Sequence, residues 1–277
     1  MKPTAWVLVM VFIAVVAAQT AKKEKAFFRA DIKARGFKNQ EELTESSINF
    51  LSDSLLLVTI NELWTIPTQR LGNVRVTKVP LNADSPPSTF VLFDLDRQGV
   101  RRTSELAVQK LKRNVWAVRD NYFLILNSSG VKRCSAEMVC GETYPTRGPV
   151  FVTPERDKVF VGGNVGTKRI LLDTTTLEPV ADSEAAVTPF PSQMQSRYDR
   201  GFDTTSVFST NGRRADSIIH VRGDHAVSQK IIVYDRSNTV IMQTEIKHKT
   251  YWTPAISPNG ARVALVRDGV LEVFNLP

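Results

Sequence analysis

The sequence predicts an all-β fold, a β-propeller of five blades. Near the end of the chain a turn followed by an apolar strand occurs twice, with Ser-Thr-Asn-Gly-Arg at 209–213 and Ser-Pro-Asn-Gly-Ala at 257–261. Comparable turns, each between two apolar strands, recur earlier at 52–54, 119–121 and 153–157. A turn and strand repeated in this way is typical of small antiparallel sheets in tandem. The uneven spacing leaves six blades open if 74–79 belongs to a degenerate one, and a β-sandwich is the competing fold.

A third strand ending in Asp or Asn follows most of these turns. Such segments end at Asp94, Asp173, Asp235 and Asn275. We expect the acidic side chain to cap the turn into the outermost strand, because a short carboxylate accepts hydrogen bonds from the backbone two residues on.

The two ends of the chain predict how the propeller closes. The final repeat stops directly after its third strand, which would leave an unpaired sheet edge. The segment 27–33 is short and has no sheet of its own. We expect it to pair with the last blade and close the ring. A frayed or helical tail over 19–40 is the alternative.

Two stretches, 61–88 and 181–204, are too polar and proline-rich for core strands. We expect them to be loop insertions on one rim, within a single domain spanning 19–277. Long insertions in compact folds are often where binding happens.

The repeat at 257–266, Ser-Pro-Asn-Gly-Ala-Arg-Val-Ala-Leu-Val, resembles the Ser-Pro-Asp-Gly repeat of bacterial WD40-like propellers, including the periplasmic TolB-like group. The copy at 209–212 is a weaker match. The Trp-Asp and Gly-His pairs of eukaryotic WD repeats are absent, so their hydrogen-bond tetrad is not expected here. The resemblance implies a secreted or periplasmic propeller with a protein-interaction or envelope-associated role.

The N-terminus predicts export. Lys2 precedes the apolar run 6–16, and small residues at 16–18 suit a signal peptidase, so we expect a signal peptide over 1–18. An uncleaved anchor is the alternative, although the run is shorter than the roughly 20 residues of a membrane span. No later segment resembles a transmembrane helix, and the mature chain is expected in the periplasm or outside the cell.

The chain has two cysteines, Cys134 and Cys140, with five residues between them. This spacing suits one disulfide across a local hairpin in an oxidising compartment. Two buried free thiols are the alternative. The spacing is neither a redox motif nor a zinc motif.

Charge favours a protein or an anionic envelope component as partner. Lys and Arg number 36 against 28 Asp and Glu, a formal net charge of +8. The basic residues are scattered and do not alternate with aromatic residues, as a nucleic-acid platform would require. We therefore expect no nucleic-acid binding.

No motif for catalysis, metal or cofactor binding stands out. His220 and His225 lack a third ligand nearby, and zinc needs three or four converging donors. The glycine cluster at 162–168 lacks the spacing of a phosphate loop. We therefore assign no catalytic, metal or cofactor residue, and expect a non-catalytic binding protein. A secreted hydrolase or lyase with its site in the central funnel is the alternative.

Four aromatic residues fall in the expected loops and are candidate anchors for a partner: Trp64, Tyr144, Phe190 and Tyr198. The alternative is that they fold the loops back over the rim.

Overall fold

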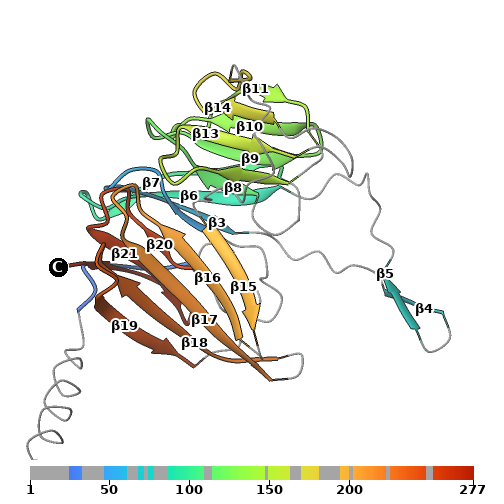
Figure 1. Cartoon of the computed structure of the whole chain (residues 1–277). Coiled ribbons are helices and arrows are strands. Elements are labelled where there is room, and N and C mark those ends of the chain that lie inside the picture. Colours follow the sequence, from blue (N-terminus) through green and yellow to red (C-terminus); the bar gives the residue numbers. More distant parts are fainter. Residues whose placement is uncertain are drawn as a thin grey trace, which may run out of the picture.

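A computed structural model describes residues 25–32, 47–60, 68–71, 74–77, 87–108, 114–146, 149–162, 170–180, 194–199, 202–222, 225–247 and 252–277. All regular elements in these ranges are strands, β1 to β22, which form five sheets and one separate ribbon (Figure 1). None of these ranges contains a helix with the length and apolar character of a membrane span.

The first three sheets, called blades 1 to 3, contain three or four antiparallel strands each. Blade 1 has the order β2 (Ser47–Phe50), β3 (Leu55–Ile60), β6 (Ser88–Asp94) and β7 (Gly99–Leu106). Blade 2 comprises β8 (Val115–Ala117), β9 (Phe123–Asn127), β10 (Gly130–Cys134) and β11 (Cys140–Tyr144). Blade 3 comprises β12 (Val150–Val152), β13 (Lys158–Val161) and β14 (Ile170–Asp173).

The last two sheets, blades 4 and 5, follow in chain order. Blade 4 comprises β15 (Met194–Asp199), β16 (Phe202–Phe208), β17 (Arg214–Arg222), β18 (His225–Tyr234) and β19 (Val240–Ile246). Blade 5 comprises β20 (Ala255–Ile256), β21 (Arg262–Arg267) and β22 (Val270–Asn275), with β1 (Phe28–Asp31) at its outer edge.

The core lies between neighbouring blades. Strands such as β3, whose six residues are all buried, are apolar throughout because both of their faces are covered. Four apolar clusters fill the spaces between blades 1 and 5, 1 and 2, 2 and 3, and 4 and 5. Blade 2 therefore separates blade 1 from blade 3. The five sheets are arranged around an axis as the blades of a five-bladed β-propeller, which confirms the predicted fold class.

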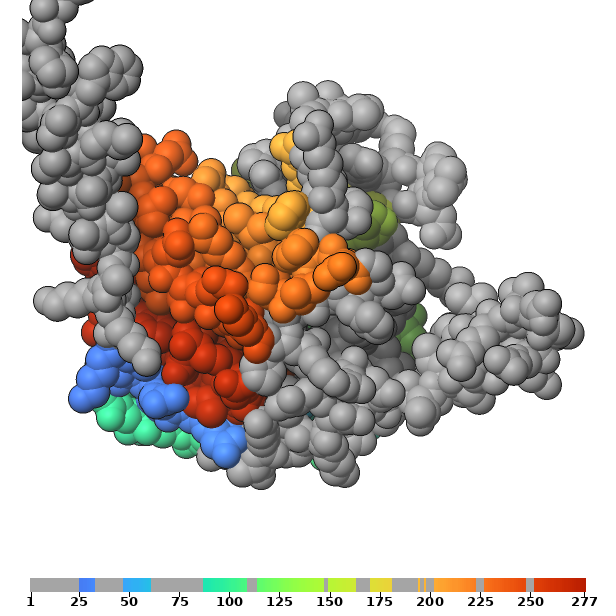
Figure 2. All heavy atoms as spheres, turned by 90° about the horizontal axis from the view of Figure 1, so that it is seen from below, coloured from blue at the N-terminus to red at the C-terminus, as the bar shows by residue number. Residues whose placement is uncertain are grey.

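The segment for which the sequence predicted a partner in the last blade is β1. It runs antiparallel to β22, with Phe28 opposite Val273 and Asp31 opposite Val270. Figure 2 shows these N-terminal residues, in blue, against the red C-terminal part of the chain. The buried Glu272 of β22 accepts contacts from Arg29 of β1 at 3.0 Å and from Arg267 at 3.4 Å.

The aspartates at the ends of the third strands cap turns, as predicted. Asp94 Oδ1 accepts hydrogen bonds from the backbone N–H groups of residues 96 and 97, at 3.1 and 3.0 Å. Asp173 and Asp235 cap the equivalent turns of blades 3 and 4 in the same way.

Two stretches differ from, or refine, the sequence prediction. The region proposed as a sixth blade forms only a two-stranded ribbon, β4 (Thr68–Leu71) and β5 (Val74–Thr77), so the count is five. Within the expected insertion 181–204, residues 194–199 form β15, an additional strand beside β16. The sequence analysis did not predict β15 because this segment is polar, and a strand is recognised in a sequence from its apolar residues.

Candidate functional site

Each blade has a turn that joins two of its strands, β2–β3, β8–β9, β12–β13, β16–β17 and β20–β21, and three of these turns have the same hydrogen bonds. They begin at Thr153, Ser209 and Ser257. In each, the hydroxyl oxygen of this first residue accepts a hydrogen bond from the backbone N–H of a residue at the start of the next strand or directly before it, at 3.3, 2.9 and 2.9 Å. The three turns are structural equivalents, although their sequences match only in part.

The fourth residue of these turns adopts a left-handed backbone. Its N–H donates to the carbonyl of the first residue at 2.9–3.2 Å. In blades 4 and 5 this residue is glycine, Gly212 with φ of 85° and Gly260 with φ of 70°. In blade 3 it is Arg156, with φ of 64°. Blade 3 therefore keeps a large residue in a conformation that normally favours glycine.

The turns of blades 4, 5 and 1 are joined by hydrogen bonds. The Thr210 N–H donates to the carbonyl oxygen of Pro258 at 3.0 Å. The backbone N–H of Asn259 donates to Asp53 Oδ1 at 3.0 Å. Residues 206 positions apart in sequence thus meet at one end of the propeller axis. This network fixes the turns relative to one another.

A pocket of about 520 Å³ opens among the five turns. Every blade contributes to its lining: Leu51, Ser52, Asp53, Val118, Arg119, Asp120, Asn121, Glu155, Arg156, Thr210 and Pro258. Its size lies in the range of pockets that bind small molecules or single side chains. We call it the turn pocket.

Arg156 is the buried charge of the turn pocket, with 6% of its surface exposed. Its Nη1 donates to the carbonyl oxygen of Phe50 in blade 1 at 2.6 Å, past the intervening blade 2. Its Nε is buried and has no hydrogen-bond partner. Burial lowers the pKa of Arg156 to about 10, and the nearby Asp53 opposes that shift. The side chain is therefore charged at neutral pH, with one donor unused.

The outer part of the turn pocket is polar and exposed. Asp120 and Glu155 expose their carboxylates there. Arg119 is also exposed, but it donates from Nε to the carbonyl oxygen of Glu155 at 3.2 Å and lies 3.8 Å from the Asp157 carboxylate. Arg156 Nε is thus enclosed by the protein, whereas the cation of Arg119 is exposed and already has partners.

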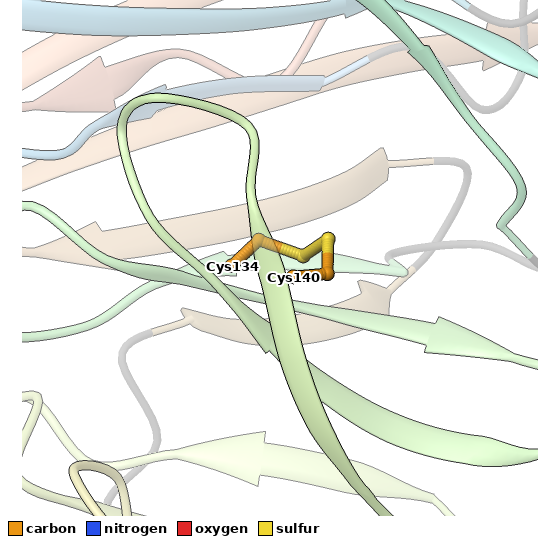
Figure 3. Close-up of a disulfide and its surroundings, with 2 residues drawn as sticks. All are labelled: Cys134 and Cys140. Carbon is orange, nitrogen blue, oxygen red and sulfur yellow. A yellow bond between two sulfur atoms is a disulfide. The ribbon is translucent and has the colours of Figure 1, made fainter.

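The cysteines lie away from this pocket, in the hairpin of β10 and β11. The structure joins Cys134 and Cys140 in a disulfide across that hairpin (Figure 3), with the sulfur atoms 2.01 Å apart. Cys134 is fully buried and packs in the cluster between blades 1 and 2.

In the part of the chain that the structure describes, the candidate aromatic anchors do not meet at the turn pocket. Tyr144 lies in β11 and packs, partly buried, against the cluster between blades 2 and 3. Tyr198 lies in β15. Trp64 and Phe190 lie outside the described residues, as does most of the expected insertions.

The sequence reasoning missed Arg156. Aligning 153–158 with the two glycine-containing turns would have placed an arginine where its counterparts have glycine. Among the residues that the structure describes, no group of three or more metal-ligating side chains is found.

Comparison with known proteins gives no family. No protein-family model and no curated protein matches the chain. Solved structures that align with it include a chain of the mitotic checkpoint complex, at 11% identity over 92% of this chain and 96% of that one, with a TM-score of 0.37. A DUF4221 member from Bacteroides vulgatus aligns at 8% identity over 90% and 96%, with a TM-score of 0.44.

BamB from Moraxella catarrhalis aligns at 11% identity over 84% of this chain and 85% of that one, with a TM-score of 0.36. Identities and TM-scores this low carry no argument about what this chain does.

Proposed function

We propose that this chain is an exported β-propeller that binds a protein or a cell-envelope component, without catalysing a reaction, at the face where the five turns meet. The turn pocket is the observation that carries the proposal. It is concave, all five blades build it, and its lining includes the buried guanidinium of Arg156 beside the exposed polar side chains of Arg119, Asp120 and Glu155. Binding sites are typically recesses with a few convergent polar groups of this kind.

Two features support export. The apolar run at 6–16 followed by small residues has the form of a signal peptide. The disulfide between Cys134 and Cys140 belongs to the kind of bond that persists in oxidising compartments. Fractionation of cells producing a C-terminally tagged chain tests this directly. Recovery of the unprocessed chain in the cytoplasm would contradict export.

The rim insertions at 61–88 and 181–204 remain part of the proposal. Their aromatic residues, with Trp64 and Phe190 foremost, are proposed to extend the contact made at the turn pocket. The basic character of the chain would favour a partner with negative charge.

Binding is tested with the mature chain, 19–277, immobilised and exposed to envelope extract of the source organism after mild crosslinking. A genuine partner is retained by the wild-type chain and by Arg97→Gly, which removes an exposed arginine outside the pocket. The same partner is lost from Arg156→Gly. Retention of nothing above background in repeated trials, or equal retention by all three proteins, would refute binding at this face. Turnover of glycan or peptide substrates would instead favour the hydrolase alternative.

A further inference from the structure

We infer that the turn pocket is a subsite for an uncharged sugar, whose hydroxyl groups donate hydrogen bonds to the exposed carboxylates of Asp120 and Glu155. This inference rests on the proposed binding function and names the chemistry of its ligand. Of the two kinds of partner in that proposal, it selects a cell-envelope component, a glycan, over a protein.

Three polar side chains of the turn pocket are exposed and have no hydrogen bond or ion pair within the part of the chain that the structure describes: Asp120, Asn121 and Glu155. Asp120 and Asn121 lie in the β8–β9 turn, and Glu155 lies in the β12–β13 turn of the next blade. These are therefore the groups that a ligand in the pocket reaches.

The other polar side chains of the lining are engaged within the protein. Thr210 Oγ1 donates to the carbonyl oxygen of Pro258 at 2.7 Å. Ser52 Oγ accepts the backbone N–H groups of residues 54 and 55, at 3.4 and 3.1 Å. Three charged side chains also have partners within the protein: Asp53, Arg119 and Arg156. The free groups are thus two carboxylates, which only accept hydrogen bonds, and one amide, which both donates and accepts.

The charges of the pocket disfavour a strongly charged ligand of either sign. An anion would meet repulsion from the exposed carboxylates of Asp120 and Glu155. A cation would meet repulsion from Arg119 and from the enclosed guanidinium of Arg156, which contributes its charge to the pocket without touching a ligand. Exposed ion pairs also contribute little to binding. An uncharged ligand that carries hydrogen-bond donors avoids both costs.

Hydroxyl groups match the free side chains. A hydroxyl donates one hydrogen bond and accepts others. Two neighbouring hydroxyls of a sugar therefore donate to the carboxylate of Asp120 or Glu155, and a further hydroxyl accepts from the amide N–H of Asn121. Hydrogen bonds from O–H to a carboxylate are short and charge-assisted, and they form without taking a charged ligand out of water.

The shape and apolar part of the pocket select a sugar ring over a peptide. A sugar ring carries several hydroxyls on one rigid frame, so little conformational freedom is lost on binding. A peptide carries at most one hydroxyl per residue on a flexible side chain. Leu51, Val118 and Pro258 supply the apolar part of the lining, against which the C–H groups of a ring can pack.

The test measures binding of uncharged sugars to the purified chain by saturation-transfer difference nuclear magnetic resonance. The panel consists of the methyl glycosides of glucose, galactose, mannose and N-acetylglucosamine. Three control probes accompany them: tetrahydropyran, which has the ring without hydroxyl groups, n-butylammonium and butyrate. We expect binding of at least one glycoside and of none of the three controls at the same concentration.

Variants locate the bound sugar. Asp120→Asn and Glu155→Gln each remove one charged acceptor, and each should weaken glycoside binding about tenfold, because a charge-assisted hydrogen bond is lost. Glu178→Gln, which changes an exposed glutamate beside β14 and outside the pocket lining, should bind as the wild type does. All three side chains are exposed, so we expect the variants to keep the wild-type urea midpoint.

The outcomes separate this inference from the proposed function. Binding of no glycoside, or binding of n-butylammonium in their place, overturns the sugar subsite even if a protein partner is captured at this face. Equal weakening by Glu178→Gln and Glu155→Gln would place the sugar elsewhere and also overturn it. Glycoside binding that Asp120→Asn and Glu155→Gln weaken, with no captured macromolecule, supports the subsite and refutes the macromolecular partner.

Competition identifies the source of the sugar. Displacement of the bound glycoside by the polysaccharide fraction of the envelope extract supports a glycan. Failure of this fraction to displace a glycoside that the pocket binds would contradict the glycan and indicate a free sugar.

Discussion

Replacing Arg156 with glycine tests whether this residue serves the fold or a ligand. Removing a buried, hydrogen-bonded arginine normally destabilises a protein strongly. Here we expect the free energy of unfolding of Arg156→Gly to stay within about 1 kcal/mol of the wild-type value, because the costs and gains of the residue nearly cancel.

The magnitude follows from the local structure. Burial lowers the pKa of Arg156 to about 10, and relief of that burial returns about 3 kcal/mol. Relief of the left-handed backbone returns about 1 kcal/mol. Against this, the bond to the Phe50 carbonyl contributes about 2 kcal/mol and the buried methylenes about 2 kcal/mol. Arg156→Ala keeps a side chain in the left-handed region and should be about 1 kcal/mol less stable than Arg156→Gly.

The assay is urea unfolding of the three proteins, monitored by the fluorescence of the buried Trp116 and Trp252. A loss of about 3 kcal/mol or more in Arg156→Gly would show that Arg156 is a structural link between blades 3 and 1. The argument that it is held for a ligand would then fail.

The same comparison has a pH dependence of known sign. Above about pH 10 the folded wild-type chain loses the Arg156 proton, whereas the unfolded chain keeps it. The unfolded state then binds more protons, so wild-type stability rises with pH relative to Arg156→Gly. At a pH half a unit above the folded pKa, the relative gain is about 1 kcal/mol. Urea unfolding of both proteins at neutral pH and at this higher pH measures the change in relative stability. A loss of wild-type stability relative to Arg156→Gly at the higher pH would contradict the assigned burial.

Three further outcomes are expected from other parts of the fold. Replacing Cys134 and Cys140 together with alanine opens a short disulfide loop and should lower the free energy of unfolding by about 2 kcal/mol; an unchanged urea midpoint would show the bond is absent in solution. Glu272→Gln leaves two arginines without their buried carboxylate and should lower the free energy of unfolding by about 2 kcal/mol. The amides of β1 should then be the first to exchange in deuterium oxide, and uniform exchange would argue against a specific weakening of the β1–β22 pairing. Gly260→Ala should lower the free energy of unfolding by about 1 kcal/mol or more beyond the effect of Gly212→Ala. A Cβ at 260 would lie 2.7 Å from neighbouring side-chain atoms, whereas a Cβ at 212 would make only an ordinary contact at 3.8 Å.

The blades could be predicted from the sequence because their signals are local. Apolar runs such as 55–60 identify strands buried on both faces, and Asn-Gly pairs at 211–212 and 259–260 identify the turns. The capping aspartates were also predictable, since each acts on a backbone group two to four residues away.

The turn pocket could not be predicted in the same way. Its lining comes from five turns that are separated by long stretches of chain, and contacts such as Asn259 to Asp53 exist only once the sheets are arranged around the axis. The polar strand β15 was not predicted for a different reason. It lacks the alternation of apolar residues by which strands are recognised in a sequence.

The pairing of β1 with β22 has a consequence for how the protein is made. Phe28 and Val273 are paired although they lie 245 positions apart in sequence, so blade 5 is incomplete until these two distant segments meet. Contacts between such distant segments form slowly during folding. Until they form, the edge of β22 and the apolar surface that Phe28 covers are open to other chains. A chaperone that shields this open edge would therefore matter most before β1 and β22 have paired.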